Sequence, residues 1–238
     1  MAERSAGSIR ARVRAEMTEE IKAVARRHLA AEGADLSLRA VARDMGMVSS
    51  ALYRYFPSRD ELLTALIVDA YNALGEAAEK ADADVRDRRD HVGRWVAVAR
   101  AVRGWSLRRP HEYALIYGSP VPGYAAPRDT VVPATRVVLV LGGILADASA
   151  AGALTPPTGV RLPAALRAEL RTIAGAIATG VDERILARGL MAWTELLGSV
   201  SLELFGHLTN VFEERTAWFE HQVRTMTRFI GLAGQNGP

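Results

Sequence analysis

Apolar residues recur with helical spacing along most of this chain. Between residues 9 and 31, Met17, Ile21, Val24, Ala25 and His28 fall on one side of a helix with 3.6 residues per turn. Residues 1–8 are small and polar, and we expect them to form a disordered arm. Similar helical spacing continues beyond residue 80, and no segment keeps the strict alternation of a half-buried strand. The pattern therefore predicts an all-α protein.

The stretch from Leu36 to Leu74 contains the clearest helix start and stop signals. Ser37 is a typical N-cap, and Gly46 supplies the left-handed conformation that often ends a helix. Between them, one apolar stripe is formed by Leu38, Val41, Ala42 and Met45. The sequence thus predicts a short helix over about 37–45, followed by a tight turn.

A second short helix is expected from about Ser49 to Phe56, because Pro57 disfavours helical geometry in the residue before it. Ser58 then starts a third helix, with Glu61 in the position of a capping box. Two short helices joined by a glycine turn are typical of a helix-turn-helix, whose second helix enters the DNA major groove. An ordinary three-helix packing unit is the alternative on spacing alone.

The residues ALYRYFPSRDELL, with the preceding helix and Gly46, are similar to the corresponding motif of TetR-type transcriptional regulators. The resemblance covers about residues 9–75. It implies a homodimeric DNA-binding regulator with an N-terminal helix-turn-helix three-helix domain and a larger helical ligand-binding and dimerisation domain. By motif position, the base-facing residues are Val48, Ser49, Ser50, Ala51 and Arg54. The phosphate contacts implied are Tyr53, Tyr55, Ser58 and Arg59, and we add Ser37 and Arg39 to the predicted DNA-binding set.

The domain organisation follows from the helix signals and from one run of charges. We expect a DNA-binding domain over 1–57, a connecting helix over 58–80, a C-terminal helical domain over 81–231 and a tail over 232–238. The boundary near residue 80 is placed before residues 82–90, DADVRDRRD, which are expected to form a solvated turn. The segment 118–127, with three prolines and two glycines, is expected to be a stiff loop.

Two helices near the C-terminus each carry one straight apolar stripe. The predicted dimer-interface residues on them are Leu186, Leu190, Leu197, Val200, Leu204, Phe219, Val223, Met226 and Ile230. Both stripes could instead pack inside one protomer, but the resemblance favours a dimer. A two-fold dimer would place two reading helices about one DNA turn apart, as a palindromic operator requires.

A small-molecule site in the C-terminal domain would be mostly apolar, with few polar groups. Candidate ligand-binding residues are Trp95, Trp105, Tyr113, Tyr117, Leu139 and Trp193. Aromatic residues at helical spacing also occur simply as core. If they form a site, we expect an apolar or aromatic effector that tilts the connecting helix.

Charge and composition agree with an intracellular nucleic-acid-binding protein. The formal net charge is +3, and the whole excess lies in residues 1–60, which hold the helix-turn-helix. There is no cysteine, and no N-terminal apolar run of signal-peptide length. The most apolar stretch, Val137–Ala146, is shorter than the roughly 20 residues that span a bilayer. We therefore expect a cytoplasmic protein.

The motifs of common enzymes are missing from the sequence. It contains no HExxH, GxSxG or GxxxxGK[ST], and its histidines lack metal-ligand spacing. We expect no catalytic residues, metal or cofactor. The function predicted is a TetR-like regulator, a repressor released from a palindromic operator by a small apolar or aromatic ligand. The alternatives are a helical enzyme and an interaction protein that does not bind DNA.

Overall fold

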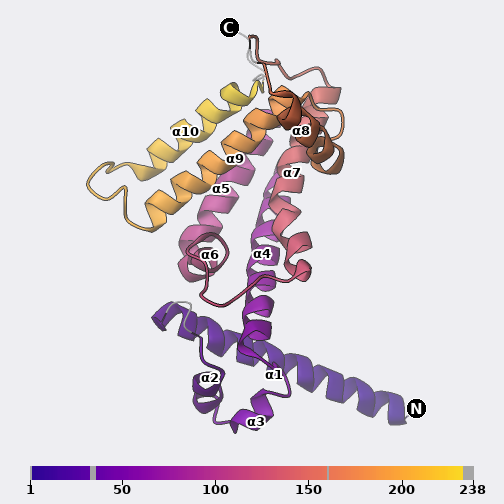
Figure 1. The fold of residues 1–238 in the computed structure, drawn as a ribbon, viewed down its shortest axis with the longest axis vertical. Helices are drawn as coiled ribbons and strands as arrows, with labels where there is room; N and C mark the ends of the chain where they lie inside the picture. The colour runs from indigo at the N-terminus through magenta and orange to yellow at the C-terminus, as the bar shows by residue number, and fades with distance from the viewer. Residues whose placement is uncertain (1, 33–35, 160, 233–238) are drawn as a thin grey trace. The chain divides into compact units, whose positions relative to one another are not determined.

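The structure, a computed structural model, describes residues 2–32, 36–159 and 161–232. The helices are α1 (Ala2–Glu32), α2 (Leu38–Asp44), α3 (Ser49–Leu52), α4 (Arg59–Asp84), α5 (His91–Arg108), α6 (Pro110–Tyr117), α7 (Val131–Ala150), α8 (Ala164–Ile177), α9 (Glu183–Leu204) and α10 (Arg215–Ile230), and a 3₁₀ helix, η1 (Arg128–Thr130), precedes α7 (Figure 1). Within the described ranges, the strand-like pairing is one isolated bridge between Leu154 and Leu232. The predicted all-α fold is confirmed.

Three helix ends differ from the sequence prediction. Helix α1 begins at Ala2, so the segment expected to be a disordered arm is helical. Helix α3 ends at Leu52 instead of Phe56, because the chain continues in tighter turns towards Pro57. Helix α4 continues to Asp84, which places Asp82 inside a helix and not in the expected solvated turn. Residues 33–35, which precede α2, and residues 233–238 of the predicted tail lie outside the described residues.

The chain divides into two compact units. Unit 1 comprises Met1–Tyr71 and Arg109–Val131, and unit 2 comprises Asn72–Arg108 and Val132–Pro238. The predicted domains, with boundaries at residues 57 and 80, are continuous in sequence. The observed unit 1 is discontinuous, because α6 and the loop after it pack with the helix-turn-helix. Helix α4 contributes its first half to unit 1 and its second half to unit 2.

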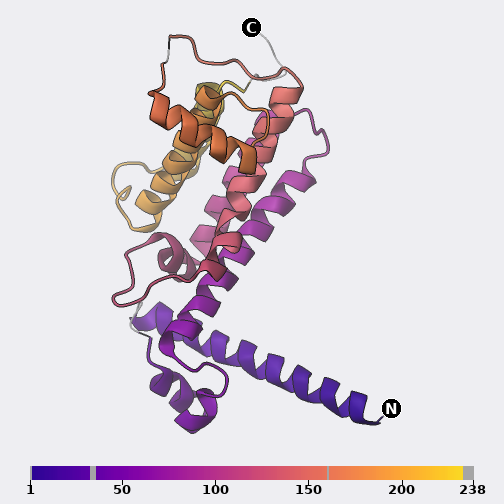
Figure 2. The same ribbon diagram turned by 45° about the vertical axis from the view of Figure 1, so that its right-hand side comes forward.

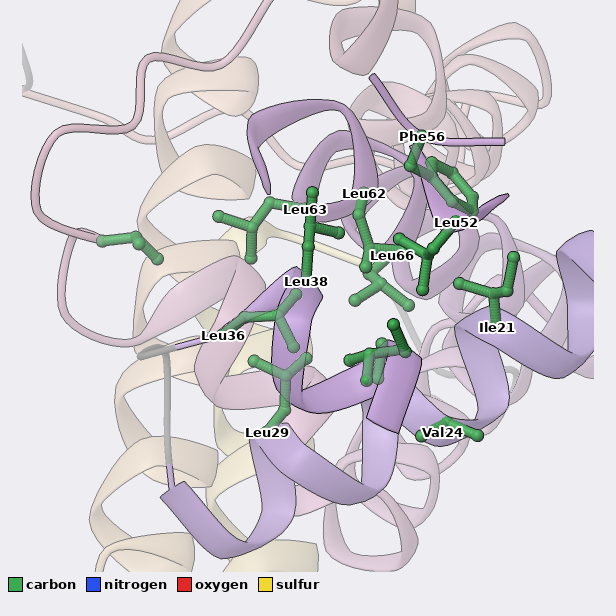
Figure 3. Close-up of a cluster of buried hydrophobic side chains, with 14 residues drawn as sticks. Ile21, Val24, Leu29, Leu36, Leu38, Leu52, Phe56, Leu62, Leu63 and Leu66 are labelled. Carbon is green, nitrogen blue, oxygen red and sulfur yellow. The ribbon is translucent and has the colours of Figure 1, made fainter. Parts of the chain in front are cut away.

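Unit 1 is built around a cluster of aliphatic side chains from α1, α2, α3 and α4. Figure 3 shows Leu36 and Leu38 beside Leu62 and Leu63, with Leu29 close to Leu36. Burying a leucine or isoleucine side chain contributes roughly 1.5–3 kcal/mol to folding. This cluster therefore holds the short α2 and α3, which are too short to be stable alone. Its buried members are Ile21, Val24, Ala25, Leu29, Leu36, Leu38, Val41, Ala42, Leu52, Phe56, Leu62, Leu63, Leu66 and Val121.

Unit 2 packs α9 against α5, α8 and α10, with α5 also touching α10 (Figure 1). Arginines along α5 tie it to its neighbours. Arg100 forms two hydrogen bonds of 2.6 Å with Glu220 of α10. Arg103 bonds Glu203 of α9 at 2.6 and 2.7 Å. Such paired N–H···O contacts between guanidinium and carboxylate fix orientation as well as distance.

A third arginine of α5 is nearly inaccessible and joins three helices. Arg94 is 3% exposed; its Nε donates to Asp82 of α4 at 2.7 Å, and Nη1 donates to Asp147 of α7 at 2.7 Å. Near the start of α7, Arg136 bonds both carboxylate oxygens of Glu79 on α4, at 2.7 and 2.8 Å. Figure 2 shows this half of α4 running beside α7. The two helices are thus tied at two points.

Helix α7 is the most apolar long helix among the described residues. Together with η1 it forms a 23-residue segment, Arg128–Ala150, which is long and apolar enough to cross a membrane by length and composition alone. This segment is longer than the apolar stretch predicted from the sequence. A core helix of a globular protein has the same properties, and Val137, Leu141, Ile144 and Leu145 are buried in unit 2.

Candidate functional site

The helix-turn-helix geometry in unit 1 is set by local sequence signals. Ser37 caps α2, its Oγ accepting from the Ala40 backbone N–H at 3.4 Å. Gly46 has a φ of +65°, a conformation that costs glycine little and other residues more. The Met47 N–H then donates to the Ala42 carbonyl at 2.9 Å, which closes the turn. These contacts confirm the cap and the turn predicted at these two positions.

Helix α3 has a buried side and an exposed side. Leu52 is fully buried, and Phe56, which follows the turn, is 7% exposed. On the other side Val48 is 71% exposed, and Ser50 and Arg54 are also exposed. Leu52 and Phe56 anchor the helix in the core of unit 1. The exposed side chains therefore remain accessible to a partner. Of the remaining residues predicted to bind DNA from α3 and its turn, Tyr53 is exposed and Ser49, Ala51 and Tyr55 are half-buried.

Helix α1 supports the turn after α3 through one arginine. The Arg14 guanidinium donates to the Arg54 carbonyl at 3.0 Å and lies 5.1 Å from the centre of the Tyr55 ring. A cation over an aromatic face is an attractive arrangement. Arg14 thus helps to position two predicted DNA-binding residues. This role was missed from the sequence, because a pair separated by 40 residues leaves no local pattern.

A groove of about 1070 Å³ lies beside α3. It is lined by Leu36, Ser37, Leu38, Arg39, Tyr53, Pro57, Ser58, Arg59 and Pro122. Five of these are predicted DNA-binding residues, and they come from α2, the turn after α3 and the start of α4. The Arg59 Nε donates to the Leu36 carbonyl at 3.1 Å, which holds the starts of α2 and α4 together. Hydroxyl groups, guanidinium groups and a helix start are the groups that commonly contact DNA phosphates.

The predicted ligand-binding residues fall in both units. Trp95 and Trp193 together line a small apolar cavity of about 20 Å³ in unit 2. Its other walls are Val138, Leu141, Gly142, Leu145, Ile177, Leu186, Gly189 and Leu190. Trp105 is buried in the same unit, and its Nε1 lacks a hydrogen-bond partner. Leu139 is 44% exposed and is absent from the cavity lining.

Tyr113 and Tyr117 belong to unit 1, where their ring centres lie 5.3 Å apart. The ring of Tyr71 lies edge-on to Tyr117 at 6.0 Å. Burial, with Tyr71 and Tyr113 nearby, raises the pKa of the Tyr117 hydroxyl above its ordinary value. Burial also raises the pKa of the Tyr71 hydroxyl, so the hydroxyls of Tyr71 and Tyr117 are uncharged at physiological pH.

The nine predicted dimer-interface residues lie mostly towards the interior of the protomer. Leu186, Val200, Phe219, Val223 and Ile230 are each at most 4% exposed, and Leu190, Leu197, Leu204 and Met226 are half-buried. Leu186 and Leu190 line the small cavity. Five of the nine side chains are thus covered within the protomer, and the other four keep some exposed surface. On the opposite side of α9, Met191 is 57% and Leu202 46% exposed, with exposed Gly198 between them.

No cluster of three or more histidine or acidic side chains suited to a metal ion occurs in the described part of the chain. The arrangement in unit 1 is instead that of a helix-turn-helix DNA-binding protein: a short helix anchored on one side and accessible on the other, beside a groove with two arginines.

Comparison with known proteins gives the family. The family model described as bacterial regulatory proteins, tetR family, matches residues 21–66, and the tetracyclin repressor-like C-terminal domain matches residues 95–226. The chain belongs to the TetR family of transcriptional regulators.

Curated relatives cover nearly the whole chain. The HTH-type transcriptional regulators Rv1816 of Mycobacterium tuberculosis and Mb1846 of Mycobacterium bovis are each 44% identical over 227 residues, 91% of this chain and 93% of theirs. Among solved structures, the putative regulatory protein SCO4313 is 36% identical with a TM-score of 0.74, covering 90% of this chain and 97% of that one. The match spans both units, so the fold and the regulator class apply to the whole chain.

Proposed function

We propose that this protein is a homodimeric, cytoplasmic repressor that binds a palindromic operator and is released from it by a small apolar or aromatic molecule. The observation that carries the proposal is the two-sided α3: Leu52 fixes it in the core of unit 1, while Ser50 and Arg54 remain exposed. The proposed role is regulatory and not enzymatic.

Two sets of residues contact DNA in this proposal. Side chains of α3 face base edges in the major groove, where serine and arginine can donate hydrogen bonds and small residues permit close approach. The groove beside α3 follows the phosphate backbone, which fixes the register of the helix. The base-facing set is Val48, Ser49, Ser50, Ala51 and Arg54. The backbone set is Ser37, Arg39, Tyr53, Tyr55, Ser58 and Arg59.

A two-fold dimer forms through the accessible side of α9. Because the predicted stripe residues Leu186 and Val200 are buried in the protomer, the surface offered to a second copy is the side that carries Met191, Gly198 and Leu202. Their spacing of seven and four residues places them along one face of the helix, and the glycine permits close approach. The two copies then present their α3 helices to successive turns of DNA.

The effector site is the apolar cavity between Trp95 and Trp193. Its volume of about 20 Å³ is much smaller than the several hundred Å³ of a typical ligand pocket, so a ligand must displace side chains or helices to enter. Helix α7 supplies four of its walls and is tied to α4 by Arg136 and by the Arg94 cluster. Ligand entry therefore moves α4, whose first half belongs to unit 1.

The test of DNA binding is selection of genomic fragments by the purified protein, followed by titration of the recovered fragment at several salt concentrations. We expect the logarithm of the affinity to fall linearly with the logarithm of the salt concentration. The double variant Arg54→Ala, Tyr53→Phe should bind much more weakly while its thermal unfolding stays unchanged. Equal affinity of variant and wild type would contradict the assignment.

The test of the effector site is tryptophan fluorescence during titration with apolar and aromatic compounds. A compound that quenches the signal should also lower operator affinity, and Trp193→Phe should weaken both effects together. Quenching compounds that leave operator affinity unchanged would disprove the coupling.

A further inference from the structure

The loop between α6 and η1 lies in unit 1 and is fixed there at two points. Val121 is 7% exposed and belongs to the same buried cluster as Leu36 and Leu38. Three residues later, the Tyr124 hydroxyl forms a hydrogen bond of 2.9 Å with the Thr64 hydroxyl of α4. A proline-rich segment distant in sequence is thereby built into the core that supports the helix-turn-helix.

Between these two anchors the chain makes a tight turn. The Tyr124 N–H donates to the Val121 carbonyl at 3.1 Å, and Gly123 has a φ of +75°. Proline at the second position and a positive-φ glycine at the third are typical of a type II turn. Because proline restricts its own backbone, the turn is stiff, and its outer residues Pro122 and Gly123 are held in a defined place.

The outer side of this turn lies on the groove beside α3. Pro122 is one of the residues that line it, together with Arg39, Tyr53, Ser58 and Arg59. A side chain added at Gly123 would meet nothing within 4 Å, so the surface beyond the turn is open. The polar and cationic walls come from the helix-turn-helix and from the start of α4, and the α6–η1 loop adds Pro122.

We propose that the Pro122–Gly123 turn is a DNA-contacting surface that packs against the sugar-phosphate backbone bound in this groove. The inference rests on the proposed operator binding and extends it, because it assigns a DNA contact to a segment outside the helix-turn-helix. The partner is the phosphodiester backbone and not the bases, so the contribution is independent of operator sequence.

The experiment places charge at the turn and measures operator affinity across a range of salt concentrations. Pro122→Gln is the neutral control for loss of the proline and should change affinity less than about threefold. Compared with it, Pro122→Glu should weaken binding about tenfold, because a carboxylate beside a phosphate is repelled. Pro122→Lys should strengthen binding and steepen the salt dependence by about one unit of slope.

A positional control separates contact with the groove from general electrostatics. Pro120 is an exposed proline of the same loop and does not line the groove, so Pro120→Glu should weaken binding much less than Pro122→Glu. Equal affinities for the Gln, Glu and Lys variants at position 122, or equal effects of Glu at 120 and 122, would overturn the inference.

The same assay includes the double variant Arg54→Ala, Tyr53→Phe. If that variant binds weakly while the charge series at Pro122 is flat, only the turn contact is disproved. If neither has an effect, the proposed operator binding itself fails. Thermal unfolding should be equal among the Gln, Glu and Lys variants at position 122, because that side chain is exposed and all three variants lack the proline.

Discussion

The two units differ in the aromatic residues that they contain. All six tyrosines, at positions 53, 55, 71, 113, 117 and 124, belong to unit 1, and all four tryptophans, at positions 95, 105, 193 and 218, belong to unit 2. Tyrosine combines an apolar ring with a hydroxyl that can bond a phosphate or a neighbouring side chain. Tryptophan supplies large apolar surface around the cavity. Unit 1 thus contains aromatic side chains that can pack and also accept hydrogen bonds, whereas those of unit 2 mainly add apolar surface.

The units also differ in what fixes their helices. Short helices of unit 1 depend on caps, a glycine turn and one aliphatic cluster. Long helices of unit 2 are joined by arginine–carboxylate pairs that radiate from α5. Tryptophan fluorescence therefore reports unfolding of unit 2, whereas hydrogen exchange of α2 and α3 reports unit 1. Variants in each unit can be distinguished by these two signals.

The largest effect is expected for Leu52→Ala. Leu52 is the buried residue of α3 and is fully inaccessible, so its truncation should cost about 3–4 kcal/mol of unfolding free energy in unit 1. Hydrogen exchange in α2 and α3 should accelerate, while the tryptophan transition moves much less. The matched control is Val48→Ala, 71% exposed at the other side of α3, which should stay within about 0.5 kcal/mol. Equal losses for both variants would disprove the two-sided helix.

Arg94→Leu should lower the unfolding free energy of unit 2 by about 3 kcal/mol. The reason is that the charged Asp82 side chain, which is poorly solvated, would lose its main partner. The effect should appear in urea unfolding followed by tryptophan fluorescence. Arg100→Leu is the control: its side chain is about half exposed, so its loss should be smaller. A larger loss for Arg100→Leu would contradict the importance of burial here.

Acid should weaken wild-type unit 2 through the same cluster. Burial alone would raise the pKa of Asp82, but hydrogen bonds from Arg94 and Arg88 outweigh it and hold this pKa below the ordinary value of 3.8. The carboxylate then stabilises the fold above pH 3.8, and that contribution disappears as pH falls from 3.8 through the lower folded pKa. Arg94→Leu should therefore show a shallower loss of stability in this pH range, measured by urea midpoints. An unchanged slope would exclude Asp82 as the responsible group.

Adjacent glycines of α7 should respond in opposite directions. A Cβ at Gly142 would collide with the backbone carbonyl of Ile177 in α8, so Gly142→Ala should destabilise unit 2 by about 2 kcal/mol. At Gly143 nothing lies within 4 Å, and Gly143→Ala should stabilise the helix by about 0.5–1 kcal/mol. The measurement is the thermal midpoint by tryptophan fluorescence. Shifts of the same sign would show that α7 and α8 do not approach closely.

The smallest effect is expected for Arg136→Gln. Its pair with Glu79 is partly exposed, so the unfolding free energy should fall by about 0.5 kcal/mol, less at high salt. Glu79→Gln should behave alike, and the double variant should add little more. A loss of unfolding free energy as large as that of Arg94→Leu would indicate that this ion pair is buried in solution.

The sequence predicted most of unit 1 because its signals are local. Ser37, Gly46, Pro57 and Ser58 each act within four residues of their own position, and the structure has caps or turns at each. The length of α3 was overestimated, since a helical turn and the tighter turns that follow it have the same apolar spacing. The return of the α6–η1 loop to this core was not predictable, because Val121 meets the buried cluster across a long stretch of chain.

For unit 2, the sequence predicted the helices but not the surfaces against which they pack. The stripes of α9 and α10 were found, but periodicity gives a face and not the surface that covers it, and Val200 and Phe219 proved to be buried in the protomer. Of the six predicted ligand-binding residues, Trp95 and Trp193 line the cavity. Asp82 was assigned to solvent because charge alternation cannot show that a distant Arg94 binds it.

Helix α7 has a consequence for which molecules can act as inducers. In sequence, its cavity residues Leu141 and Leu145 lie between Arg136 and Asp147. Arg136 binds α4 directly, and Asp147 is attached to α4 through Arg94. Under the proposed function, a compound small enough to fit without moving α7 occupies the site silently, and a bulkier one displaces both attachments at once. Induction should then show a size threshold, with potency rising abruptly, and not gradually, along a homologous series of compounds.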